Sequence, residues 1–169
     1  MSPAINNQSG QQVSSRLHGR SPARLGAIQA LYQMDIAATD ANQVISEFLD
    51  QRLAELAKEM GAKKVDEDHF RNIVLGVVRE QMRIDPALDT HLAKGWHLSR
   101  IDSILRAILR SAAYELSNAP DVPSRVIINE YIDIAHVFFG GEEPGVVNGI
   151  LDHLAREWRP DEYQLKKDG

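Results

Sequence analysis

Apolar residues recur three and four positions apart along most of this chain, and no segment alternates apolar and polar residues over more than a few positions. A helix brings positions i, i+3, i+4 and i+7 to one face, whereas a half-buried strand needs strict alternation. The pattern therefore predicts an all-α fold. We expect about seven helical segments in a compact bundle with short connections.

Several of the expected helices carry recognisable start and stop signals. Ser21 and Pro22 predict the first, with serine as the N-cap and proline as the first helical residue. Because proline disfavours a helix that passes through it, we expect a separate short helix after Asp85 and Pro86. With that short helix counted as 86–94, the six segments after the first are expected near residues 40–60, 66–78, 86–94, 101–118, 123–139 and 144–158.

The composition is that of an ordinary globular protein. Its 169 residues, 43% of them apolar, suffice for one domain or for two small halves that share a core. The absence of cysteine excludes disulfides and thiolate zinc sites. No stretch approaches ~20 apolar residues and the N-terminus lacks a signal-peptide core, so we expect a cytoplasmic protein with no membrane segment. We expect a disordered polar and basic arm at 1–19, a single all-helical domain at 20–158 and a polar C-terminal tail at 159–169.

Charge is distributed unevenly along the chain. Residues 1–34 carry three arginines, Arg16, Arg20 and Arg24, and no acid, so they hold +3 and the rest of the chain must hold −8 to give the net charge of −5. Arginines that lead into a helix N-terminus form a plausible phosphate site, because unpaired N–H groups and the helix dipole also favour an anion there. A solubilising arm explains them equally well, and the stem of Arg24 could simply cover the core.

No residue pattern points to catalysis. The six histidines show no HExxH spacing, and the chain has neither GxSxG nor a P-loop, so we expect no catalytic residue, no metal and no cofactor. Glu130 and Asp133 are expected to be solvated. Asn129 and Asn148 lie in apolar helical runs, where a buried amide needs hydrogen-bond partners, and we expect these to come from neighbouring helices rather than from a ligand.

Four blocks of sequence, taken together, resemble the NusB family of bacterial transcription factors. They occur in the order and spacing of that family and cover roughly residues 20–158. The resemblance implies a fold of two packed three-helix bundles. The blocks are RLGAIQALYQMD, RAILRSAAYEL, VPSRVIINEYIDIAHVF and VNGILD.

The resemblance also implies a role without catalysis. NusB proteins pair with NusE, a protein of the small ribosomal subunit, and the pair binds the boxA element in RNA from ribosomal operons. From there it helps to build an RNA polymerase complex that reads past terminators. The resemblance leaves open a homodimer that covers the RNA-binding arm.

Site residues follow from the same resemblance. Arg20 and Arg24, with Arg16 in the arm, are expected to contact RNA, and Gln29 is expected to contact a base or a phosphate. Tyr32 and Leu105 are the expected NusE contacts. An exposed Leu105 would make that interface more apolar, and we expect the Tyr32 ring in the core with its hydroxyl at the rim. Two places of the family's denser arginine run are Ser21 and Pro22 here, so we expect a salt-dependence slope on the order of −2 to −3 for this arm.

Two alternatives stay open at this point. One is a stand-alone RNA-binding domain like that fused to ribosomal RNA cytosine methyltransferases, although without a cofactor-binding domain we expect no methyltransferase activity. The other is a helical protein-interaction bundle with no RNA role.

Overall fold

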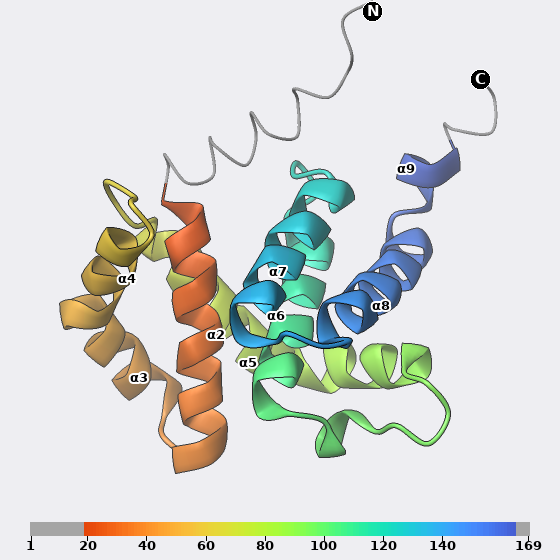
Figure 1. Cartoon of the computed structure of the whole chain (residues 1–169), viewed down its shortest axis with the longest axis horizontal. Helices are drawn as coiled ribbons and strands as arrows, with labels where there is room; N and C mark the ends of the chain where they lie inside the picture. Colours follow the sequence, from red (N-terminus) through yellow and green to blue (C-terminus); the bar gives the residue numbers. More distant parts are fainter. Residues whose placement is uncertain (1–18, 165–169) are drawn as a thin grey trace, which may run out of the picture. The chain divides into compact units, whose positions relative to one another are not determined.

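The computed structural model describes residues 19–164 (Figure 1). All the regular secondary structure of these residues is helical, with turns and loops between the helices and no strand, so the all-α prediction is confirmed. None of the helices in residues 19–164 is both long enough and apolar enough to cross a membrane. Contacts divide the chain into two compact units, Met1–Leu75 and Gly76–Gly169, and helix α5 (Glu67–His91) contributes residues to both.

The first unit contains the helix that follows the basic arm. The stretch predicted as one helix at 40–60 is continuously helical but contains a π-helical turn in its middle. The Asp40 side chain caps its start by accepting a hydrogen bond from the Asn42 N–H at 3.1 Å. The elements of this unit before α5 are α2 (Arg20–Ala37), α3 (Ala41–Glu47), the π-helical turn (Phe48–Arg52) and α4 (Leu53–Glu59).

Helix α2 packs closely on α4. A Cβ on Gly26 would lie 2.4 Å from the Cδ2 atom of Leu53, so any larger residue would require the buried leucine side chain to shift. Gly26 therefore lies on the face of α2 that is buried against α4. Phe48 stacks on Phe70 with ring centroids 5.8 Å apart and completes this part of the core.

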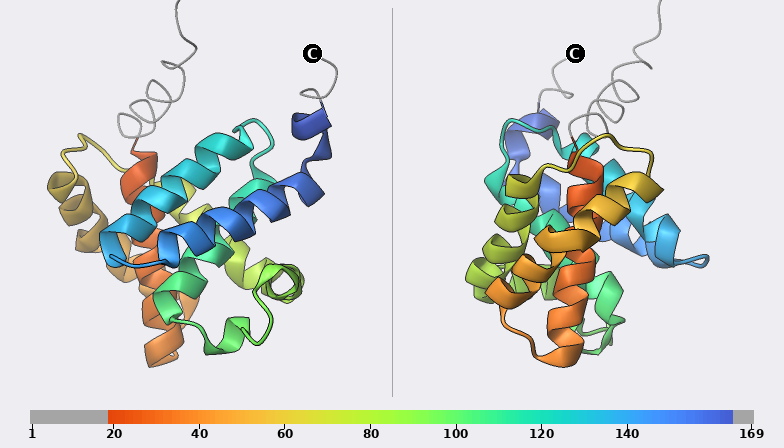
Figure 2. Two further views of the ribbon diagram at one scale, coloured as in Figure 1. Left: turned by 45° about the vertical axis from the view of Figure 1, so that its right-hand side comes forward. Right: turned by 90° about the vertical axis from the view of Figure 1, so that its left-hand side faces the viewer.

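The second unit is built around three long helices that pack on one another. Helices α7 and α8 run side by side in opposite directions, and α6 packs on both (Figure 2). Residues buried in this unit include Ile108, Leu116, Ile127, Val147 and Leu151. Its elements after α5 are a 3-10 turn (Leu98–Arg100), α6 (Ser103–Asn118), α7 (Ser124–Phe138), α8 (Glu143–Trp158) and α9 (Pro160–Gln164).

Polar residues of the second unit depart from the sequence predictions. Glu130, expected to be solvated, is only 5% exposed, whereas Asn148, expected to be a buried amide, lies exposed on α8. Tyr131 and Glu115 are both buried, and the Tyr131 hydroxyl donates a hydrogen bond to the Glu115 carboxylate. A hydrogen-bonded carboxylate can therefore replace an apolar side chain at one position of a helix-packing face.

The predicted break at Pro86 is wrong, because α5 continues through this residue to His91. Ile84 and Leu88, on either side of the proline, are completely buried. Asp85 accepts two hydrogen bonds from Arg110 of α6, both at 2.8 Å. Burial and a bidentate ion pair hold the two halves of α5 in line, and together they outweigh the local preference of proline.

The start of the segment predicted as a polar C-terminal tail is held in place. The Arg159 guanidinium donates hydrogen bonds to backbone carbonyls at the end of α6 and in the following turn, at 2.8 Å to Leu116, 2.7 Å to Ala119 and 2.5 Å to Val122. A positive charge at a helix C-terminus also opposes the negative end of the helix dipole. Residues 165–169 lie outside the described part of the chain.

Candidate nucleic-acid interface

The start of helix α2 is fixed by a glycine that packs on the loop before α5. Gly19 has a φ of 79°, and a Cβ at this position would lie 2.5 Å from the Lys64 carbonyl oxygen and 2.6 Å from the Asp66 nitrogen. The Gly19 carbonyl accepts hydrogen bonds from the N–H groups of Asp66, at 3.0 Å, and Ala23. Only glycine satisfies both the left-handed backbone and the close contact.

The helix therefore begins earlier than its sequence signals predict. Gly19 is the N-cap and Arg20 the first helical residue, whereas Ser21 was predicted as the N-cap. Ser21 is 5% exposed and lies inside the first turn. Contact with the loop at residues 64–66 decides where the helix starts, and such a contact leaves no local signal in the sequence.

Arg20 is the predicted RNA contact that the structure places at the surface. Its side chain is 43% exposed, and its Nε atom lies 3.8 Å from a carboxylate oxygen of Asp66. The other Asp66 oxygen accepts a hydrogen bond from the His69 N–H at 3.0 Å and caps the start of α5. Because the ion pair is long and exposed, it contributes little to stability, and a phosphate group can compete with it.

Two lysines that the sequence analysis did not select lie in the same loop. Lys63 and Lys64 are exposed and follow Gly61, whose φ is 69°. The backbone of Lys64 contacts the residue that precedes Arg20. The only available signal was a pair of adjacent lysines after a helix, and that signal does not indicate which other cation lies beside them.

The second predicted arginine has a different environment. Arg24 is 1% exposed and belongs to the largest fully buried side chains of the described residues. An RNA contact would require its guanidinium to leave this position, so the structure favours the alternative in which Arg24 covers the core. Arg16 lies outside the described residues.

Gln29 is half-buried and contacts the last residue of the π-helical turn. Its Oε1 atom accepts a hydrogen bond from the Nε atom of Arg52 at 3.1 Å. Arg52 also forms ion pairs with Glu55, at 3.3 Å, and with Glu59, at 3.5 Å. The Gln29 side chain therefore serves contacts within the first unit, and its predicted role toward RNA would compete with them.

The two predicted partner contacts also differ in exposure. Tyr32 is 37% exposed, so the prediction that its ring belongs to the core is wrong. Ile36, one turn further along α2, is 61% exposed and extends this apolar surface. Leu105 is 3% exposed, so it does not supply the apolar interface surface that an exposed leucine at this position would give. Its place in the core follows from the phase of α6, which begins at Ser103 after the Asp102 N-cap.

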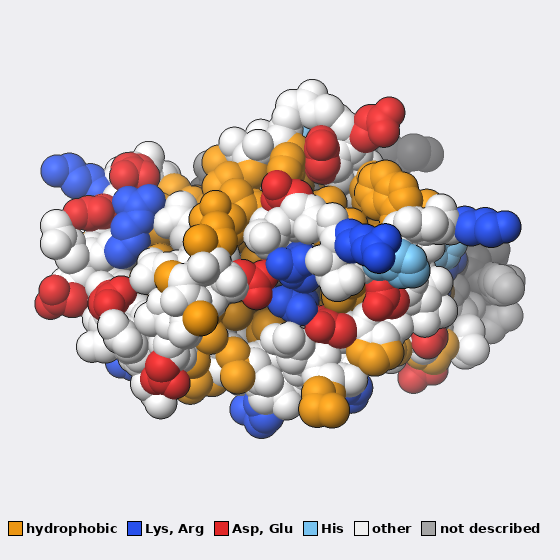
Figure 3. Space-filling model, turned by 90° about the horizontal axis from the view of Figure 1, so that it is seen from below, with side chains coloured by type: hydrophobic (Ala, Val, Ile, Leu, Met, Phe, Trp, Pro, Cys, Tyr) orange, Lys and Arg blue, Asp and Glu red, His pale blue; other side chains and the backbone are white. Residues whose placement is uncertain are grey.

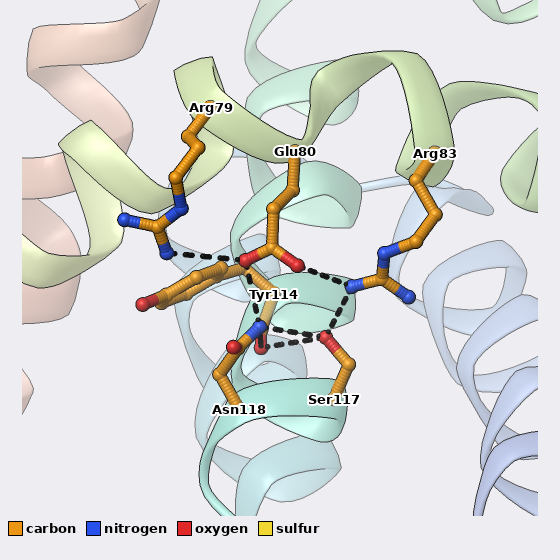
Figure 4. A network of polar contacts seen from close by, with 6 residues as sticks. All are labelled: Arg79, Glu80, Arg83, Tyr114, Ser117 and Asn118. Carbon is orange, nitrogen blue, oxygen red and sulfur yellow. Dashed lines mark hydrogen bonds and ion pairs between the residues drawn. The ribbon is translucent and has the colours of Figure 1, made fainter.

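Charged groups elsewhere in the described residues form structural networks. In the second unit, the Glu80 carboxylate accepts hydrogen bonds from Arg83 at 2.6 Å, Arg79 at 3.3 Å and Asn118 at 3.0 Å (Figure 4). Arg83 also donates to the Ser117 hydroxyl at 2.8 Å. These contacts tie α5 to α6.

The same network keeps its carboxylate ionised. Burial by itself raises the pKa of Glu80, but the hydrogen bonds from Arg83 and Arg79 outweigh this effect and hold the pKa below its ordinary value. A general acid or base works best with a pKa near the operating pH. Glu80 is shifted in the opposite direction, so the network stabilises the helix pair and is not suited to proton transfer.

Within residues 19–164, no group of three or more histidine, aspartate and glutamate residues could hold a metal ion. Charges are also dispersed on the face in Figure 3, where Lys and Arg side chains alternate with Asp and Glu and hydrophobic side chains reach the surface between them. This face therefore offers an anion no extended cationic surface.

The comparisons with known proteins all point to one family. The model of the NusB family matches residues 21–156. The chain is 43% identical over 163 residues to the transcription antitermination protein NusB of Rhodopseudomonas palustris (strain BisB18), with 96% of each chain covered. It is 50% identical over 147 residues to the protein of the same name from Bradyrhizobium sp. (strain BTAi1 / ATCC BAA-1182), with 87% of each chain covered.

Solved structures show the same fold. T. maritima NusB superposes with a TM-score of 0.69 at 31% identity, covering 85% of this chain and 94% of that one. A structure of the antitermination factors NusB and NusE in complex with dsRNA superposes with a TM-score of 0.66 at 21% identity, covering 82% of this chain and 97% of that one. At this lower identity the likeness concerns the fold alone.

Proposed function

The chain belongs to the NusB family, and on that premise we propose that it is a transcription antitermination factor that acts without catalysis in the cytoplasm. In this role it pairs with NusE, and the pair binds boxA RNA of ribosomal operons and joins an RNA polymerase antitermination complex. The observation that carries the proposal is the match of the family model to residues 21–156, together with relatives named for antitermination that align over nearly the whole chain.

The RNA contact in this proposal is centred on Arg20. Its side chain is 43% exposed and lies at the positive end of α2, next to a loop with two further cations. Arg16 would extend the contact along the arm. Arg24 and Gln29 are held by contacts within the protein, so they support the RNA surface by fixing α2 rather than by touching the nucleic acid.

The partner contact in this proposal is the exposed end of α2. Tyr32 and Ile36 are separated by one helical turn and are 37% and 61% exposed. An aromatic residue beside an aliphatic one on a helix surface is typical of a protein interface. Leu105 is buried in the second unit, so it would not touch the partner itself and would act only by holding the start of α6.

A transcription assay tests the function. Bacterial RNA polymerase, NusE and the remaining elongation factors transcribe a template with boxA upstream of a terminator, with and without this protein. We expect added protein to raise readthrough on the boxA template and not on a template in which boxA is scrambled. Unchanged readthrough would favour the alternative, a helical interaction or ribosomal-RNA-binding module without a role in antitermination.

A further inference from the structure

Three cations from distant parts of the sequence gather at one end of the first unit. Arg20 opens α2, and Lys63 and Lys64 lie in the loop between α4 and α5. Their proximity is enforced by backbone, because the Lys64 carbonyl oxygen would lie only 2.5 Å from a Cβ on Gly19 and the Gly19 carbonyl is hydrogen bonded to the Asp66 N–H. The loop therefore cannot move away from Arg20 without loss of this hydrogen bond.

The two lysines are available to bind an anion. Neither Lys63 nor Lys64 takes part in an ion pair with any residue in the range 19–164, and both are exposed. Of the nearby acids, Asp66 caps α5 and contacts Arg20, and Asp68 pairs with Arg71 at 3.2 Å. Glu67 is exposed next to the same loop, and residues 61–71 with Arg20 hold four cations and three acids, a local formal charge of +1 in a chain whose net charge is −5.

We propose that Lys63 and Lys64 form, with Arg20, a phosphate-binding surface that holds the RNA backbone beside the start of α2. This inference rests on the proposed function, because the RNA is the ligand of that same site. A lysine ammonium is a point charge that attracts phosphate without reading a base. The loop therefore supplies affinity, and sequence preference comes from other contacts.

The two lysines should determine part of the salt dependence of RNA binding. Each phosphate that a protein cation neutralises on a single strand contributes about −0.7 to the slope of log K against log salt. Loss of both lysines should reduce the magnitude of this slope by about 1.4. At about 0.1 M salt this corresponds to a loss of affinity on the order of tenfold, equal for boxA and for scrambled RNA.

The test compares two double variants of the full chain in complex with NusE. Lys63→Gln/Lys64→Gln removes the loop cations, and Lys94→Gln/Arg125→Gln removes two exposed cations of the second unit with the same change in net charge. Fluorescence anisotropy with labelled boxA RNA, repeated from about 0.05 to 0.3 M salt, gives affinity and slope for each protein. Thermal unfolding checks that all three proteins are folded.

We expect only the Lys63→Gln/Lys64→Gln protein to bind RNA more weakly and to show a smaller slope of log K against log salt. An unchanged slope in the loop variant would overturn this inference while leaving the proposed function intact, because the natural protein would still bind boxA. Equal losses in both variants would also overturn it, since they would reflect net charge rather than this site. If the natural protein with NusE does not bind boxA at all, both the inference and the proposed function fail.

Discussion

The Asp66 N–H donates a hydrogen bond of 3.0 Å to the Gly19 carbonyl, and this contact joins the beginning of α2 to the beginning of α5. Asp66 also caps α5 through His69 and contacts Arg20 with its second carboxylate oxygen. The exposed arginine is thus placed by backbone and capping contacts that hold two helix starts together. The stability of this end of the first unit and the position of its cations should therefore change together.

Gly19→Ala tests this contact. The new Cβ would meet backbone atoms of residues 64–66 at 2.5 to 2.7 Å, and the φ of 79° is itself unfavourable for alanine. We expect a loss of about 2 kcal/mol or more in the free energy of unfolding. Gly145→Ala in α8 is the matched control, because its Cβ would meet nothing within 4 Å and alanine favours a helix. A Gly19→Ala protein as stable as the natural one would contradict the described contact.

Pro86→Ala is expected to stabilise the protein. Proline inside α5 lacks the N–H that would donate to the preceding turn, and alanine restores this hydrogen bond. After allowance for the greater entropy of the unfolded alanine chain, we expect a gain of about 1 kcal/mol in denaturant unfolding. Pro160→Ala, at the first residue of α9 where proline is well tolerated, should give no gain. A lower stability for Pro86→Ala would mean that the proline has a role beyond α5.

The Glu80 network gives a pH-dependent prediction. Because the pKa of folded Glu80 lies below its ordinary value of 4.5, its contribution to stability is fully present above that value and is lost as pH falls through the folded pKa. We expect Glu80→Gln to lower Tm at pH 7 and the difference from the natural protein to shrink below about pH 4.5. A Tm difference that stays constant down to pH 3 would show that ionisation of Glu80 is not what stabilises the helix pair.

Alanine variants of Arg20 and Arg24 should differ in what they weaken, RNA binding in the first and stability in the second. Arg20→Ala removes an exposed side chain, so we expect weaker RNA binding with Tm unchanged. Arg24→Ala removes a fully buried side chain, so we expect a loss of about 2 kcal/mol and a Tm lower by roughly 5 °C. RNA titration and thermal unfolding of both variants check this. An Arg24→Ala protein with natural Tm and impaired RNA binding would restore Arg24 as a direct contact.

The sequence was sufficient to predict the fold class and most helices, because apolar spacing is a local property that burial then satisfies. The prediction was wrong where contacts between residues far apart in the chain decide whether a segment is helical. Pro86 remains helical because Ile84 and Leu88 are buried and Arg110 holds Asp85.

The candidate site was predicted only in part, for a related reason. Resemblance to a family identified Arg20, but it could not show that Arg24 is buried, that Tyr32 is exposed or that Leu105 lies in the core. Such differences depend on helix phase and packing at single positions. Lys64 was missed because the residue that its backbone contacts, Gly19, lies more than forty residues earlier in the chain.

The most direct test of the account is the affinity of this protein for boxA RNA with and without NusE, measured by fluorescence anisotropy against a scrambled RNA of the same length. We predict that NusE tightens binding to boxA by about 5- to 150-fold, the usual range of coupling between two binding sites, and that scrambled RNA gains much less. Equal binding of both RNAs, with no effect of NusE, would contradict the proposed role of this chain in antitermination.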